Sequence, residues 1–171
     1  MTERKRKTLF VLFNALLMAG LFIIQYNGVF SISIGGANPM LTLSLCVAFS
    51  MFASELDSVL FGMFTGFLTD GAAAGTKGFF NTLTFMLIAL AVALTVRYLF
   101  NNNYRSAIAL GVICGAVYYL ARFAFCVPKE SIESGVGYLL SCSLPSVIYT
   151  AAVTPLLYFT EKRIFTYYKA R

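Results

Sequence analysis

The residues of this sequence that are best suited to chemistry lie in apolar surroundings, and they are few. Asp70 follows Gly62 and Gly66 at intervals of four, so that on a helix all three share one stripe. An acid near a membrane interior is costly, which points to proton or ion transfer or to a contact with another helix or a partner. The simpler alternative is that Asp70 ends its helix at the outer surface and caps the turn at Gly71.

Arg122 lies inside a long apolar run, and three roles for it are open. Its side chain can extend to the membrane interface, it can pair with Asp70 in the outer leaflet, or it can contact a substrate anion. Asn14, Gln25 and Asn81 also lie in or near apolar runs, where they are most simply hydrogen-bond partners between helices.

No group of residues has the pattern of a catalytic centre or a metal site. The sequence has no histidine, the side chain most often used as a metal ligand and general base, and it has no P-loop or nucleophile elbow. Cys46, Cys114, Cys126 and Cys142 form no CxxC pair. Cys126 and Cys142 both fall near the outer face, and whether they form a disulfide is left open by the sequence. We therefore expect no enzyme, no cofactor and no metal.

The composition is that of an integral membrane protein. Of 171 residues, 59% are hydrophobic and only 12% are charged, whereas a soluble domain usually carries about 25% charged residues. So few charges cannot cover a water-facing surface, and the apolar surplus must face lipid. The net charge of +6 comes largely from the flanks of apolar runs, not from a basic face interleaved with aromatic residues, which argues against a nucleic-acid partner.

The apolar runs predict an all-α fold, with a single transmembrane domain over residues 1–171 and basic cytoplasmic tails at 1–7 and 160–171. The first run is long and no Ala-x-Ala site follows it, so we interpret it as a retained span and not as a cleaved signal peptide. The six predicted spans are Thr8–Gln25, Met40–Ser54, Val59–Thr69, Phe79–Phe100, Ser106–Cys126 and Val136–Phe159.

The second and third runs are short, and the charged stretch Glu55–Ser58 separates them. At about 1.5 Å per residue they reach roughly 22 to 25 Å, less than a hydrocarbon core of about 30 Å. They form either a helical hairpin in a thinned bilayer or a shallower re-entrant pair. The third can extend through Ala74 if protein shelters Asp70. Asn38 and Pro39 suit the N-cap and first position of the second run.

Lysine and arginine are distributed unevenly about the six spans. If the N-terminus is cytoplasmic, ten of the 13 lie on the cytoplasmic side, and only Lys77 and Lys129 lie in outer loops. This positive-inside pattern predicts a multi-pass protein with both termini in the cytoplasm. The basic tails are also suited to contact with anionic membrane lipid.

The stretch Gly62–Asp70, followed by Gly78 and a long apolar run, resembles the central signature of the MreD family of the bacterial rod-shape system. Pro39, Pro145 and Pro155 also stand where they resemble that family, so the resemblance covers nearly the whole chain. It implies a non-enzymatic scaffold of the bacterial inner membrane. Such proteins act with MreC, and through it with MreB, RodA and a transpeptidase, to organise peptidoglycan synthesis during cell elongation.

The alternative resemblance is to the substrate-binding components of energy-coupling-factor vitamin transporters, small six-span proteins that are similar to MreD in fold. They dock a transporter partner through a small-residue stripe on the first span, and Ala15 and Ala19 form such a stripe here. Their vitamin pocket opens outward, near the predicted places of Asp70 and Arg122. Sparse polar residues in the spans favour MreD. Packing within the chain, a partner contact and self-association all stay open for the small-residue stripes.

Overall fold

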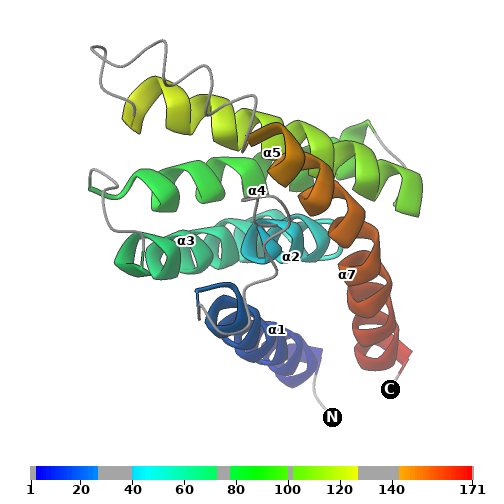
Figure 1. The fold of residues 1–171 in the computed structure, drawn as a ribbon. Helices are drawn as coiled ribbons and strands as arrows, with labels where there is room; N and C mark the ends of the chain where they lie inside the picture. Colours follow the sequence, from blue (N-terminus) through cyan, green and yellow to red (C-terminus); the bar gives the residue numbers. More distant parts are fainter. Residues whose placement is uncertain (1–2, 27–39, 73–77, 100–101, 127–142, 171) are drawn as a thin grey trace.

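The computed structural model describes residues 3–26, 40–72, 78–99, 102–126 and 143–170 (Figure 1). These residues form helices and no strand, which confirms the predicted all-α class over the described part of the chain. Three stretches are long and apolar enough to cross a membrane, namely Thr8–Tyr26, Phe80–Tyr98 and Tyr104–Phe125. The helices are α1 (Glu3–Tyr26), α2 (Leu41–Ser50), α3 (Glu55–Ala72), α4 (Phe80–Tyr98), α5 (Tyr104–Cys126) and α7 (Leu144–Ala170).

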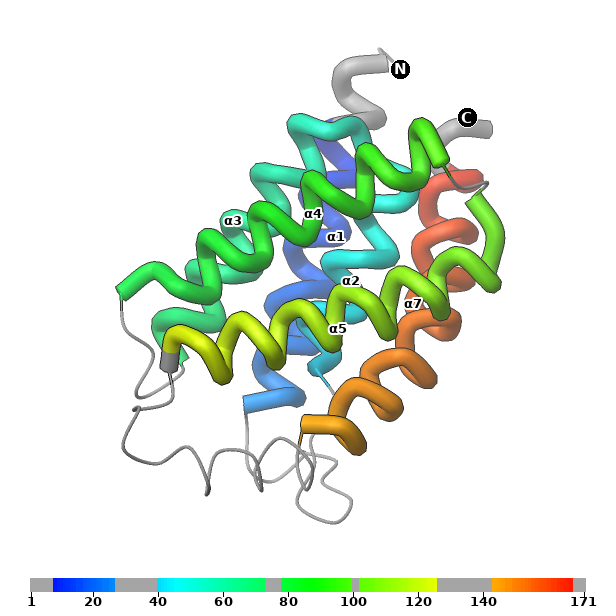
Figure 2. The backbone as a smooth tube through the Cα atoms, turned by 90° about the horizontal axis from the view of Figure 1, so that it is seen from above, coloured from blue at the N-terminus to red at the C-terminus, as the bar shows by residue number. Residues whose placement is uncertain are grey.

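Successive helices run in alternate directions through the bundle (Figure 2). One end holds the beginning of α1, the end of α2, the beginning of α3, the end of α4 and the end of α7. We name it the terminal end. The other, the distal end, holds the end of α1, the end of α3, the beginning of α4 and the beginning of α7. The beginning of α1 and the end of α7 therefore lie on the same side of the molecule.

The short helix α2 is the centre of the bundle. It contacts all five other described helices, and nine of its ten residues are buried, among them Leu43, Leu45, Val47 and Phe49. A helix that is apolar on all sides is stable only when it is enclosed in this way. At ten residues α2 is about 15 Å long, roughly half the thickness of a hydrocarbon core.

The predicted boundary between the second and third runs was wrong. α2 ends at Ser50, and Glu55–Ser58, which we expected to interrupt the apolar run, is the first turn of α3. Ser54 caps this turn, because its Oγ accepts from the Asp57 N–H (3.3 Å) and donates to the Asp57 carboxylate (2.6 Å). α3 also continues through Asp70 to Ala72, so its 18 residues reach about 27 Å.

The last helix, α7, is longer at its end than predicted. It continues past Phe159 to Ala170, so residues 160–170 extend the helix. Pro155 lies inside the helix, and α7 changes direction part-way along its length (Figure 1). Proline lacks the N–H that would bond the carbonyl of Ala151 and its ring crowds that carbonyl, which accounts for a bend. The predicted start at Val136 lies outside the described residues.

Candidate helix-packing and polar site

Gly62 and Gly66 lie where α3 crosses α4. A Cβ atom on Gly66 would be 2.6 Å from the carbonyl oxygen of Asn81 and would also overlap the Cα of Thr82. A Cβ on Gly62 would be 2.7 Å from the carbonyl oxygen of Phe85. Only glycine allows the two backbones to approach this closely, as in other small-residue contacts between membrane helices.

Asp70 continues the same stripe and binds the first turn of α4. Its Oδ1 accepts from the N–H of Asn81 (3.0 Å), and its Oδ2 accepts from the N–H (2.8 Å) and the hydroxyl (2.6 Å) of Thr82. The first N–H groups of a helix have no partner within the helix and carry a partial positive charge. The carboxylate therefore caps α4 from a neighbouring helix. The geometry is that of a contact between helices, and not of a cap on the Gly71 turn.

Asn81 extends the polar contacts from α4 to α5. Its Oδ1 accepts a hydrogen bond from the hydroxyl of Tyr118 (2.9 Å), and both residues are almost completely buried. Its Nδ2 has no hydrogen-bond partner among the described residues. The ring of Tyr118 packs edge-on against Phe85, so that one tyrosine supplies both apolar and polar contact between α4 and α5.

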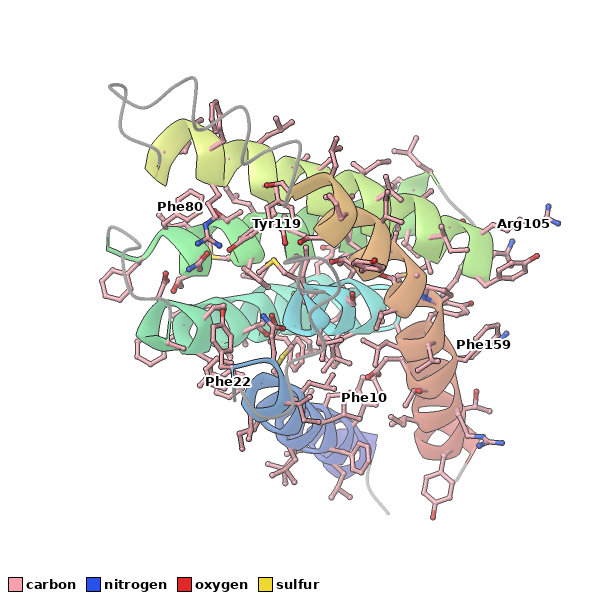
Figure 3. The ribbon with its side chains drawn as sticks, viewed as in Figure 1. Phe10, Phe22, Phe80, Arg105, Tyr119 and Phe159 are labelled. Carbon is pink, nitrogen blue, oxygen red and sulfur yellow. The ribbon has the colours of Figure 1, made fainter. Side chains whose placement is uncertain are left out.

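Arg122 lies on α5 one turn beyond Tyr118 and hydrogen-bonds with it. It also interacts electrostatically with Tyr26 at the end of α1, and Asp70 acts on the same tyrosine. Asp70 and Arg122 therefore both approach Tyr26. A direct ion pair between the acid and the arginine stays a prediction. Figure 3 shows this distal region near the labelled Phe80 and Tyr119.

Ala15 and Ala19 flank the inward face of α1. That face is made by Phe10, Asn14 and Met18, which are buried, whereas the two alanines are only half-buried. A Cβ on Gly20 would have no atom within 4 Å, so no described helix approaches α1 closely at that position. The small-residue stripe of the first span thus lies beside the line of contact, in contrast to the stripe on α3.

Sequence reasoning missed a polar seam between α2 and α7. The Thr150 hydroxyl accepts from the N–H of Met40 (3.1 Å), and the Thr150 carbonyl accepts from the Ser44 hydroxyl (3.1 Å). Thr154 donates to that same carbonyl (2.7 Å), one residue before Pro155. The signal was present in the sequence, because Ser146, Thr150 and Thr154 recur at intervals of four and so share one helix face.

The remaining family-motif positions have mixed outcomes. Gly78 has φ +67° in the turn before α4, a conformation that favours glycine. Pro145 lies in the first turn of α7, where proline is tolerated. Pro39 and Cys142 lie outside the described residues, and so does the side chain of Cys126, so the question of a Cys126–Cys142 disulfide falls outside the described part of the chain. Cys46 and Cys114 are buried free thiols.

No protein-family model, curated protein or solved structure matches this chain. Over the described residues, no group of three or more Asp, Glu, Cys or His side chains is placed to hold a metal ion. The site therefore consists of a close glycine contact and an aspartate cap between α3 and α4, a buried tyrosine–asparagine bond to α5, and an arginine near the end of α1.

Proposed function

We propose that this protein is a non-enzymatic, MreD-like scaffold of the bacterial inner membrane, which helps determine rod shape and organise peptidoglycan synthesis with an MreC-like partner. The observation that carries the proposal is the α3–α4 contact, in which the Gly62–Gly66–Asp70 stripe is used for packing between helices. This is the stripe on which the family resemblance rests. Both oxygens of this carboxylate already accept hydrogen bonds from α4, which favours a structural role for Asp70 over a catalytic one.

We also propose that the chain crosses the membrane six times with both termini in the cytoplasm, with the ten-residue helix α2 forming only about half of the second crossing. The alternating helix directions and the common end of α1 and α7 support an even number of crossings (Figure 2). Arg97 belongs to the predicted cytoplasmic side and forms an ion pair with Glu55 (2.5 Å) at the beginning of α3. Reporter fusions at both ends test the topology: a fluorescent protein that matures only in the cytoplasm should fluoresce at either terminus, and a dark terminus would refute it.

Depletion in the native host tests the scaffold function, on the premise that its cells are normally rods. Loss of the protein should produce rounded cells, and an MreC-like protein should co-purify with the tagged chain. Re-expression of the wild type should restore rods, whereas the variant Gly66→Leu should not. The matched control is Gly20→Leu, since no described atom lies near that position. Rods that persist after depletion would refute the proposal.

A vitamin-binding transporter component is the second candidate. The observation in its favour is that Asp70, Arg122, Tyr26 and Tyr118 gather at one end of the bundle, the end proposed to face outward. The Asp70 oxygens already bind α4, which weakens this candidate. Gentle extraction followed by mass spectrometry distinguishes the two, because a binder retains a stoichiometric small molecule and a scaffold does not.

A further inference from the structure

Among the described residues, Glu161 is the one acid with no exposed surface. It lies on α7 just beyond the predicted sixth span, which ends at Phe159. Neither of its carboxyl oxygens has a hydrogen-bond partner among the described residues. An ionised carboxylate is very costly to bury in this way, because nothing replaces the water that it loses.

The neighbour of Glu161 on α1 is Asn14, whose amide comes within hydrogen-bonding reach of the carboxyl group. Asn14 is also completely buried, and its Nδ2 donates to the carbonyl of Phe10 (3.1 Å). Its Oδ1 receives no hydrogen bond within the described part of the chain. Two helices thus bring unsatisfied acceptors together. A proton on the carboxyl group converts one acceptor into a donor and satisfies both groups at once.

Aromatic rings cover this contact. Phe10, one turn before Asn14, stacks on Phe49 (5.4 Å between centroids) and meets Phe165 edge-on (5.9 Å). Phe165 is one turn beyond Glu161 and also packs against Phe52. Figure 3 shows the labelled Phe10 in the space between α1 and α7. The rings leave the carboxyl group in apolar surroundings, which favour its neutral form.

No described basic group offsets a negative charge on Glu161. Burial is the largest influence and raises the pKa of Glu161 to about 8, with the nearby Asn14 amide acting in the opposite direction. Lys162 and Arg163 are exposed, and the Tyr158 hydroxyl donates to the Asn102 carbonyl. The charged or titratable groups on this half of α7 and of the helices packed against it are Glu3–Lys7 on α1, Cys46 on α2, Tyr104 and Arg105 on α5, and Tyr158, Lys162, Arg163, Tyr167, Tyr168 and Lys169 on α7 itself.

We propose that Glu161 is a proton-binding site, whose protonated carboxyl group donates a hydrogen bond to Asn14 Oδ1 and so holds α7 against α1. Deprotonation gives the proton to water, breaks this hydrogen bond and leaves a buried anion, which loosens the part of α7 beyond Pro155. A metal ion in the proton's place would need about six oxygen ligands, more than these two side chains supply. This inference does not depend on the proposed function.

The sign of the pH dependence follows from the direction of the shift. The pKa of Glu161 in the fold lies above its ordinary value of 4.5, so the closed contact binds more protons than the open one. Its stability is therefore complete below the ordinary pKa and falls as the pH rises toward about 8.

Infrared spectroscopy of the full-length protein in lipid nanodiscs tests the protonation directly. The carbonyl stretch of a protonated carboxyl group should be present at neutral pH and should disappear with a midpoint near pH 8. The band should be lost in Glu161→Gln and retained in the matched control Glu55→Gln, whose carboxylate is in an exposed ion pair. In Asn14→Leu the band should move to higher frequency, because the carboxyl group loses its acceptor.

Hydrogen exchange tests the consequence for α7. Below the midpoint, the wild type and Glu161→Gln should exchange residues 156–167 at the same rate, and above it the wild type should exchange several-fold faster. A midpoint near the ordinary pKa, or a band that survives in Glu161→Gln, would overturn the proposal. A lower midpoint pH of the carbonyl band in sodium than in choline would also overturn the proposal, since it would show that a metal ion competes with the proton for Glu161. If Glu161→Gln does not fold, the Asn14→Leu band shift decides the question.

Discussion

The Asp70 carboxylate binds both the main chain and the side chain of Thr82, because Asp70 Oδ2 accepts from the backbone N–H and from the hydroxyl of Thr82. The residues are 12 apart in sequence and belong to consecutive helices. One carboxylate thus fixes the angle at which the chain re-enters the bundle after the α3–α4 connection. The glycine contacts immediately before Asp70 hold the two helices close enough for this bond to form.

Replacing Asp70 with Asn should weaken the α3–α4 contact. The amide keeps one acceptor but loses the charge that favours a helix N-terminus, and hydrogen bonds to charged groups contribute about 1.5 to 3 kcal/mol. We expect the free energy of unfolding to fall by about 1 to 2 kcal/mol, the lower part of that range, because the site is partly exposed to solvent. Reversible unfolding in mixed micelles measures it. The control is Asp57→Asn, which alters an exposed cap on the same helix.

Replacing Gly66 with Ala should destabilise the bundle, because the new methyl group would overlap the backbone of α4. Overpacking of this kind costs about 1 to 3 kcal/mol. Gly20→Ala is the control, and it should be neutral or slightly stabilising since alanine is the better helix former. Equal stabilities for the two variants in the same unfolding assay would contradict the contact described for α3 and α4.

Replacing Tyr118 with Phe should leave Asn81 Oδ1 buried without its donor. Hydrogen bonds between membrane helices contribute about 0.6 kcal/mol on average and up to about 1.7 kcal/mol, and we expect the upper part of this range because both residues are buried. Tyr98→Phe removes an exposed hydroxyl and serves as the control. A double-mutant cycle with Asn81→Leu should show that the two effects are not additive.

Replacing Glu55 with Gln should change stability by no more than about 0.5 kcal/mol, although its ion pair with Arg97 is short. The Arg97 side chain is 63% exposed and that of Glu55 is 36% exposed, so water and salt screen the attraction. Unfolding at low and high salt checks this prediction. A large effect that persists at high salt would show that the pair is shielded in the membrane-embedded protein.

The long helices were predictable because their apolar runs are flanked by charges or turn residues, and α1, α4 and α5 agree with the predictions to within a few residues beyond the basic N-terminal turn. The boundary at Glu55 was missed because two acids in an apolar region resemble a loop, whereas Ser54 and Asp57 together cap a helix. The end of α7 was missed for a related reason, since Glu161 was assigned to a solvated tail although it points into the bundle.

The candidate site was predictable in its residues but not in its contacts. The spacing of Gly62, Gly66 and Asp70 placed them on one face of a helix. Which helix that face meets depends on tertiary structure, and the atoms that Asp70 binds are backbone N–H groups, which carry no sequence signal. For Ala15 and Ala19, the spacing predicted a packing stripe, but they lie beside the buried face of α1. A small-residue pattern is common in membrane helices and does not by itself identify a close contact.

The enclosure of α2 has a consequence for the biosynthesis of this protein. α7 supplies hydrogen-bond partners for Ser44 and for the N–H of Met40, and it is translated after every other described helix. During synthesis, the Met40 N–H and the Ser44 hydroxyl therefore lack these hydrogen-bond partners until the ribosome has completed α7. A premature stop codon upstream of α7 would leave the central helix of the core without these partners, and membrane proteases would meet a truncated chain whose defect lies at its centre.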